Sequence, residues 1–332
     1  MASEKRCIVW LVAFTALFNI ASPGISGVAR ADDANIIRDV IAKQLSKSPD
    51  SLTQRDFESV TTLSLSRIAV VDITLLGACI NLKDLDLSYT PVSDIFPLTN
   101  VKGLETLNLS GTLMGEIPQL AEMKELTSLQ LSRSNMTDLS PIAGLKKLKR
   151  LNLFGNQITD VKHLSKLTGL EHLDISGNQI TDISPLSKLT NLTGLLAYNN
   201  QISDIRPLSN MKNLNTLDLS NNQIEDLRPI SDLKNLTALF VNGNKFDDFS
   251  VIGELPNLMY LGLADNDIKD ITVLSKLTDL RGLLLGGTAV SDLTPLTGLS
   301  QLKKLSIKDC RNITDQQVQD LKNTLPDLVI KR

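Results

Sequence analysis

The feature that most constrains this chain is a leucine that recurs every 22 residues through most of its length. We call these leucines the anchors. They are Leu63, Leu85, Leu107, Leu129, Leu151, Leu173, Leu195, Leu217, Leu239, Leu261, Leu283 and Leu305. A fixed period of this size predicts a solenoid, because each unit is too short to bury its own apolar residues and must pack against its neighbours. The 332 residues therefore predict one repeat array rather than two globular domains.

The stretch Leu214–Leu236, LNTLDLSNNQIEDLRPISDLKNL, represents one repeat. In its LxL segment both leucines point into the core and the residues beside them point the other way, because side chains alternate along a strand. Five residues after the anchor, most central repeats carry an asparagine. Its amide both donates and accepts hydrogen bonds, so we expect it to satisfy backbone groups at the turn. These asparagines are Asn156, Asn178, Asn200, Asn222, Asn244 and Asn266.

Two further columns follow within each repeat. Seven residues past the anchors lies an apolar column that runs from Val70 to Val290 and includes Met114. Two residues beyond it lies an acidic column that runs from Asp72 to Asp292. Stacked carboxylates could serve glycoside hydrolysis or bind calcium, but an active pair would differ from its neighbours instead of recurring in each turn. We therefore predict that these acidic residues accept backbone N–H groups where short turns begin.

The histidines and cysteines show no catalytic or metal-binding spacing. Their offsets place His163 and His172 on opposite surfaces, and the sequence has no CxxC motif or glycine-rich phosphate loop. Cys79 and Cys310 lie in the first and last repeats, roughly 50 Å apart at ~4.8 Å per strand, so they cannot form a disulfide within one chain. We predict that the protein is not an enzyme and has no catalytic residues, no metal ligands and no cofactor.

The run Ser176–Leu195, SGNQITDISPLSKLTNLTGL, resembles the leucine-rich repeat of the bacterial internalin type. Residues 34–82 are similar to the helical cap that precedes such arrays in secreted bacterial proteins. The resemblance implies an α/β solenoid, a right-handed superhelix with a concave parallel β-sheet and convex 3₁₀ turns. It also implies a role in binding proteins, which in some members are host-cell receptors.

The N-terminal end of the array is predicted to be a helical cap. A helix is expected over residues 34–45, and its apolar stripe would cover the open end of the first repeat. The stripe consists of Ile36, Ile37, Val40, Ile41 and Leu45. Residues 52–57 are expected to lead into the first strand. We assign residues 32–60 to this cap and residues 61–309 to about 12 repeats of 22 residues.

The C-terminal end departs from the repeat in another way. After Leu305 the period slips to 23, which puts Leu328 in the next anchor place, and Cys310 replaces the recurring asparagine. Ile313-Thr314-Asp315 is predicted to open a helix that continues to about Lys322. We assign residues 310–332 to a C-terminal helical capping repeat.

Residues 1–31 have the features of a secretory signal peptide. Lys5 and Arg6 precede an apolar run from Cys7 to Ala21, and Ala29-Arg30-Ala31 supplies the small residues of a cleavage site. The alternative is a membrane anchor, but the run falls short of the ~20 residues that span a bilayer. We predict cleavage after Ala31, a secreted or periplasmic protein, and no stable membrane insertion after cleavage.

Large side chains gather at positions that point to the concave face, where other repeats have serine or asparagine. They are Phe154, Leu196, Tyr198, Phe240, Tyr260 and Leu284, and the polar residues beside them are Arg150, His172, Asp174 and Asp218. Exposed aromatic clusters are typical anchors of protein interfaces, so we predict that this surface binds a protein. The alternative is that the rings lie flat over neighbouring strands and stabilise the sheet.

The sequence leaves three classes of function to compare. The first is a protein–protein interaction module that acts through its concave face, as a monomer. The second is an envelope-maintenance or regulatory scaffold, similar to the phosphatase-regulating repeat proteins. The third, a repeat domain that serves an enzyme, is disfavoured because no residues remain for a catalytic domain. A net charge of −3 argues against a nucleic-acid partner, which would need a concentrated basic face.

Overall fold

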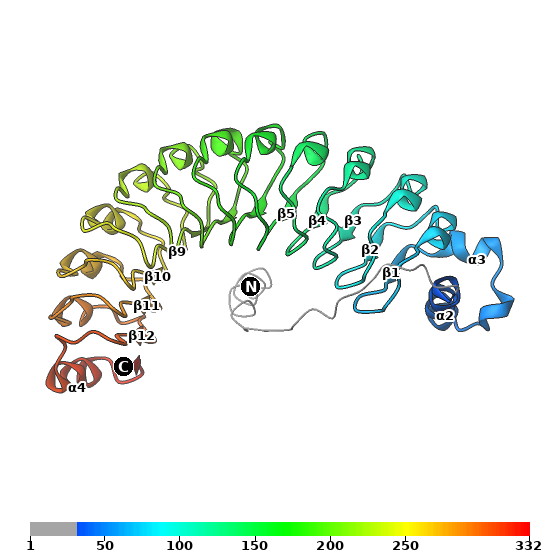
Figure 1. Cartoon of the computed structure of the whole chain (residues 1–332). Coiled ribbons are helices and arrows are strands. Elements are labelled where there is room, and N and C mark those ends of the chain that lie inside the picture. Colours follow the sequence, from blue (N-terminus) through cyan, green and yellow to red (C-terminus); the bar gives the residue numbers. More distant parts are fainter. Residues whose placement is uncertain (1–31) are drawn as a thin grey trace.

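The computed structural model describes residues 32–332, which form a curved rod (Figure 1). The predicted signal peptide at 1–31 and its cleavage after Ala31 lie outside the described residues. Strands line the inside of the curve and short 3₁₀ turns line the outside, with helices at both ends (Figure 1). This is the predicted α/β solenoid.

The strands form one parallel sheet of 13 strands, in which each strand pairs with the next along the chain. Its register places anchor on anchor, for example Leu195 on Leu217. A connection between parallel neighbours in a sheet is right-handed, which gives the solenoid its hand. The strands are β1 Thr62–Ser64, β2 Asp84–Asp86, β3 Thr106–Asn108, β4 Ser128–Gln130, β5 Arg150–Asn152, β6 His172–Asp174, β7 Gly194–Leu196, β8 Thr216–Asp218, β9 Ala238–Phe240, β10 Tyr260–Gly262, β11 Gly282–Leu284, β12 Lys304–Ser306 and β13 Val329–Lys331.

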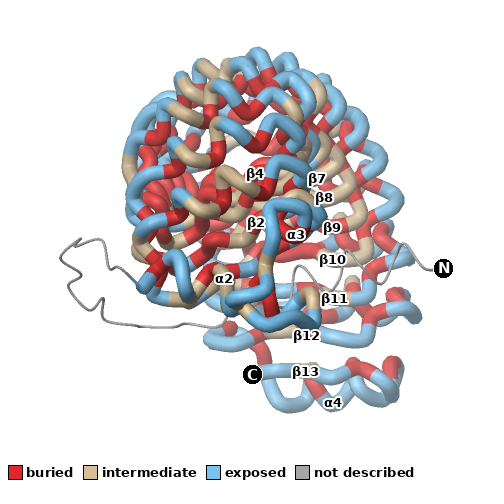
Figure 2. Tube along the Cα trace, turned by 90° about the vertical axis from the view of Figure 1, so that its right-hand side faces the viewer, coloured by how far each residue is buried: buried red, intermediate tan, exposed pale blue. Residues whose placement is uncertain are grey.

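The core is a continuous apolar column inside the coil, seen as the buried residues of each turn in Figure 2. Both leucines of each LxL segment are buried, as predicted from strand alternation, for example Leu217 and Leu219. The second apolar column is also buried, with one correction. Met114 is only partly buried, because its repeat turns differently there: Leu113 and Gly115 both adopt the left-handed conformation, with φ of 58° and 67°.

The aspartates of the acidic column accept backbone N–H groups at the start of the convex turns, as predicted. Asp182 accepts the backbone N–H of Ser184 at 2.7 Å, and Asp226 accepts that of Arg228 at 2.9 Å. The same bond recurs along the outside of the rod wherever an aspartate precedes a 3₁₀ turn. Glu116, whose side chain is one methylene longer, is the exception among the column's members. The column therefore orders the convex turns.

The buried asparagines form the predicted ladder beneath the sheet. Asn222 donates to the carbonyls of Leu219 and of Ala197 in the preceding repeat, at 2.9 and 3.0 Å. Its side-chain oxygen accepts the N–H of Ile202 at 3.0 Å. Each asparagine thus joins two repeats. Cys310 takes the same place at the C-terminal end, where its thiol donates to the carbonyl of Leu285 at 3.0 Å.

The N-terminal cap consists of α2 (Asp33–Leu45) and a short α3 (Gln54–Ser59). Ile37 and Ile41 of α2 are fully buried against the first repeat, as the apolar stripe predicts. The carboxylate of Asp33 is also buried, and it accepts the N–H groups of Val71 and Asp72, both at 2.9 Å. Helix α3 was not predicted. It forms because Thr53 and Asp56 make a capping box at its start.

The C-terminal cap contains the predicted helix, α4 (Asp315–Thr324). It is followed by β13, whose register pairs Leu305 with Ile330. The prediction of Leu328 as the next anchor is therefore wrong, since the last repeat spans 25 residues. An α-helix rises ~1.5 Å per residue and a 3₁₀ helix ~2 Å, so a convex segment that is α-helical needs more residues to cover the same length. Leu328 is instead buried just before the strand.

Replacing Thr314 with alanine is expected to lower the free energy of unfolding by about 1 kcal/mol. Thr314 caps α4: its hydroxyl accepts the N–H of Gln317, and Gln317 accepts the N–H of Thr314 at 2.9 Å. Urea denaturation measures the loss. Gln319→Ala, on the exposed side of the same helix, should cost less; equal losses in both variants would mean that the cap does not stabilise this end.

Candidate functional site

The ten residues predicted for the concave surface lie on or just beyond β5 to β11. They occupy three rows that run across the strands. Arg150, His172 and Tyr260 lie one residue before their anchors; Asp174, Leu196, Asp218, Phe240 and Leu284 lie one residue after; Phe154 and Tyr198 lie three residues after. We call this set the concave patch. The structure brings its members to one face, and their role in binding stays a prediction.

Three rings of the concave patch, those of Phe240, Tyr260 and His172, rest on glycines of the next repeat. A Cβ atom added to Gly262 would lie 2.8 Å from the ring of Phe240, and one added to Gly282 would lie 3.0 Å from the ring of Tyr260. A Cβ atom added to Gly194 would lie 3.0 Å from the imidazole of His172. Phe240 and Tyr260 are consequently half-buried, each with part of its surface open to the concave side. Each glycine lies 22 residues after the ring it supports, a signal that the sequence carried but that our prediction did not use.

Phe154 and Tyr198 form an aromatic pair across two repeats. Their ring centroids are 5.9 Å apart and the planes are tilted by 37°. The guanidinium of Arg133, which the sequence analysis did not include, lies 5.3 Å from the centre of the Phe154 ring. Ser176, in the same row between the two rings, is fully buried. Its hydroxyl lies near the carboxylate of Asp174 but makes no well-aligned hydrogen bond.

The carboxylates beside these rings have perturbed acidities. Burial raises the pKa of Asp174 to about 6, and the charge of Asp218 adds to the shift. Burial also raises the pKa of Asp218. The pKa of Tyr198 is raised to about 12, by burial first and then by the charges of Asp174 and Asp218. Burial and the charge of Arg150 lower the pKa of His172. The centre of the patch is thus an apolar surface with two acidic groups set into it.

Leu284 and Tyr89 are the most open of the large concave side chains. Leu284, on β11, is 39% exposed. Tyr89 is 47% exposed and lies several repeats away from the concave patch, towards the N-terminal end, under the guanidinium of Arg67 at 4.7 Å from its ring centre. The structure therefore separates Tyr89 from the other two tyrosines.

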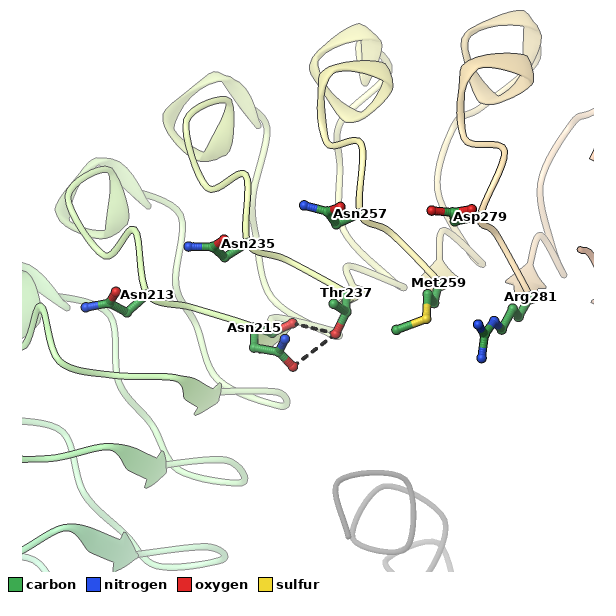
Figure 3. Close-up of a pocket in the computed structure, with 8 residues that line it drawn as sticks. All are labelled: Asn213, Asn215, Asn235, Thr237, Asn257, Met259, Asp279 and Arg281. Carbon is green, nitrogen blue, oxygen red and sulfur yellow. Dashed lines mark hydrogen bonds between the residues drawn. The ribbon is translucent and has the colours of Figure 1, made fainter. Parts of the chain in front are cut away.

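A polar groove of about 510 Å³ runs along the flank of the rod (Figure 3). It is lined by Asn213, Asn215, Asn235, Thr237, Asn257, Met259, Asp279 and Arg281. Asn213 and Asn235 donate to the carbonyls of the preceding repeat, to Thr190 at 2.9 Å and to Lys212 at 2.8 Å. These asparagines form a second ladder, which recurs every 22 residues and which the sequence analysis missed. Because their amides are already bonded to backbone, the groove is explained by repeat structure.

Within residues 32–332, no group of three or more histidine, cysteine, aspartate or glutamate side chains is placed to hold a metal ion. Cys79 and Cys310 are free and buried. Over the same residues, no helix has both the length and the apolar character needed to cross a bilayer.

Comparisons with protein families and with solved structures both identify leucine-rich repeat proteins. The family model for leucine-rich repeats in two copies matches residues 124–166, 146–188, 168–210 and 212–254. No curated protein matches the chain by sequence. Among solved structures, an internalin (inlF) from Listeria monocytogenes is 30% identical, with 90% of this chain and 96% of that chain covered and a TM-score of 0.81.

Two further Listeria monocytogenes structures are similar. Internalin C2 is 34% identical, with 66% of this chain and 100% of that chain covered and a TM-score of 0.61. The functional domain of InlJ is 20% identical, with 88% of this chain and 67% of that chain covered and a TM-score of 0.62. At that identity, the last comparison bears on the fold alone.

Proposed function

The chain belongs to the internalin family of leucine-rich repeat proteins, and from that premise we propose that it is a secreted or periplasmic module that binds a protein through the concave patch. The observation that carries the proposal is the cluster of half-buried rings, Leu284 and half-buried carboxylates on a face that other repeats fill with small polar residues.

The position of the rings bears on both interpretations of the patch. Phe240 and Tyr260 rest on neighbouring strands, as the sheet-packing alternative predicts, and this contact fixes their orientation. Held rings lose little conformational entropy when a partner covers their open side, which makes them effective interface anchors. The carboxylates of Asp174 and Asp218 repel phosphate groups, which favours a protein over a nucleic acid.

The test is affinity for a partner obtained by crosslinked capture with the mature protein and then purified. Changing Tyr198 and Tyr260 together to serine should weaken binding by at least about tenfold, because each ring supplies part of a buried contact. Isothermal calorimetry measures the change, and circular dichroism confirms that the variant stays folded.

The matched control is Phe96→Ser. Phe96 begins a 3₁₀ turn on the outside of the rod and is 66% exposed. Its loss should leave the affinity unchanged. Unaltered binding by the tyrosine variant, or a loss caused by Phe96→Ser, would place the interface elsewhere and overturn the proposal.

Export is tested separately. The Ala29-Arg30-Ala31 motif predicts that the mature protein starts at Asp32. Intact-mass measurement of protein recovered from outside the cytoplasm should give the mass of residues 32–332. A membrane-bound species that retains Met1 would support the anchor alternative.

A further inference from the structure

We propose that Asp174 and Asp218 receive a cationic side chain, arginine or lysine, that the protein partner inserts over β6 to β8. This inference rests on the proposed function, and it adds the chemistry of the partner's central contact. Leu196 lies between the two aspartates in the same row, one strand from each. With strands ~4.8 Å apart, the aspartates are about 10 Å apart across the sheet, so a cation above Leu196 is within reach of both.

The first argument is that the local structure does not need these charges. Asp174 and Asp218 accept the backbone N–H of Ser176 and Ser220, at 3.0 and 2.9 Å. An amide does the same work in other repeats. Asn108 and Asn152 occupy the equivalent positions and accept the corresponding N–H groups at 3.1 and 2.9 Å. Asparagine would therefore turn the chain equally well at 174 and 218, without burying a charge.

The second argument is that both charges lack a cation. In the part of the chain that the structure describes, the hydrogen bonds of Asp174 and Asp218 come from backbone N–H groups and no lysine or arginine pairs with either. Glu171, directly before β6, does have such a partner: it pairs with Lys149 at 3.0 Å. Burial raises the pKa of both aspartates, which shows that their charged forms are destabilised in the free protein.

The third argument concerns the surroundings of the carboxylates. Tyr198 lies close enough to both aspartates for their charges to raise its pKa, and Phe240 occupies the next place after Asp218 in the same row. Aromatic faces attract guanidinium and ammonium groups, and the chain already uses this contact where Arg133 lies over Phe154. Because both aspartates are already half-buried and held by backbone hydrogen bonds before binding, an arriving cation meets a preorganised acceptor, and the pairing is stronger than at an open surface.

The probe is a random peptide library displayed on phage and selected on the mature protein. Peptides that bind the concave patch should share an arginine or lysine at one position. The protein variant Asp174→Asn/Asp218→Asn keeps both backbone hydrogen bonds and removes both charges. It should bind a selected peptide about tenfold or more weakly, as should the wild type with citrulline in place of the peptide's arginine.

The loss of affinity caused by the Asn variant and the loss caused by citrulline in the peptide should not be additive. If the aspartates contact that arginine, the Asn variant should bind the citrulline and arginine peptides with nearly equal affinity. Asp86→Asn is the matched control, because Asp86 accepts the N–H of Ser88 at 2.9 Å from the same strand position in β2, outside the concave patch. It should leave the affinity unchanged.

The possible failures are distinguishable. Peptides that lose affinity with Tyr198→Ser/Tyr260→Ser but bind the Asn variant as tightly as wild type would overturn the cation inference and leave the proposed function standing. The same holds if such peptides share no cationic residue. If selection yields no peptide that depends on the two tyrosines, the proposed function fails and the inference fails with it.

Discussion

Replacing Asn222 with alanine is expected to lower the free energy of unfolding by roughly 3–5 kcal/mol. The amide is buried, donates to the carbonyls of Ala197, Leu219 and Ser220, and accepts the N–H of Ile202. The consequences differ between these groups. Ala197 and Leu219 each keep a second ladder asparagine as donor, at 3.1 Å in both cases, so their carbonyls lose one bond of two. The N–H of Ile202 loses its acceptor inside the rod.

The expected loss combines these terms. A buried N–H without an acceptor costs ~1–3 kcal/mol, and each lost hydrogen bond a further ~0.5–1.5 kcal/mol. Urea denaturation followed by circular dichroism measures the sum. A smaller m-value in the variant would show that the rod no longer unfolds as one cooperative unit, because the lost bonds join adjacent repeats.

Two further variants separate burial from residue type. Asn235→Ala removes an exposed amide that also donates to the preceding repeat, at 2.8 Å to Lys212. Water can replace that bond, so the loss should be below about 1 kcal/mol. Asn222→Ser, which installs the residue found at position 134 of the same column, should fall in between. Similar losses of unfolding free energy for Asn222→Ala and Asn235→Ala would mean that the buried asparagines stabilise the rod no more than the exposed ones.

The ladder also shows how far the repeat period carries prediction. A constant position and a constant residue type together identified the asparagines and the aspartates that start the convex turns. Where another residue type occupies the asparagine position, its hydrogen bonds were not predicted. Thr90, Thr112, Ser134 and Thr288 occupy the same position and donate to carbonyls just beyond the strands, at 2.6 to 2.9 Å, which was not predicted. The threonines donate within their own repeat, and Ser134 donates to the preceding one.

The ends and the patch were predictable to different degrees. Helix α2 followed from its apolar stripe and helix α4 from its capping residues, whereas helix α3 was not predicted. The anchor at Ile330 was not predicted either, because register depends on the length of the convex segment. The membership of the concave patch followed from strand alternation. Its electrostatics did not, since the pKa of Asp174 depends on its own burial and on the charge of Asp218, two repeats away. A single repeat's sequence contains none of these relations.

Replacing Asp174 with asparagine is expected to raise the free energy of unfolding at pH 7, by up to about 3 kcal/mol. The pKa of this carboxyl rises from 3.8 to about 6 in the folded protein, mainly through burial. The folded state therefore binds a proton more tightly than the unfolded state. The wild type has its full stability from this group below about pH 4 and loses it as the pH rises through about 6.

Asparagine does not ionise, so the variant should gain stability relative to the wild type as the pH rises from about 4 to about 6. Urea denaturation at pH 3.5 and pH 7 should show nearly equal stabilities at the lower pH and a more stable variant at the higher one. Asp86→Asn serves as the control, because it makes the same change at the same strand position outside the concave patch. A variant that is less stable than the wild type at pH 7 would show that the charge stabilises the fold, and the prediction would be wrong.

The stability and the peptide affinity of the Asp174 variants together decide why the protein has a carboxylate at this position. If asparagine stabilises the rod and also weakens the selected peptides, the protein retains a charge that costs it stability because that charge is used in binding. If asparagine stabilises the rod and leaves peptide binding unchanged, Asp174 lowers the stability of its repeat without contributing to binding. The stability measurement thus decides whether the carboxylate is strained in the free protein, and the peptide measurement decides whether a partner's cation relieves that strain.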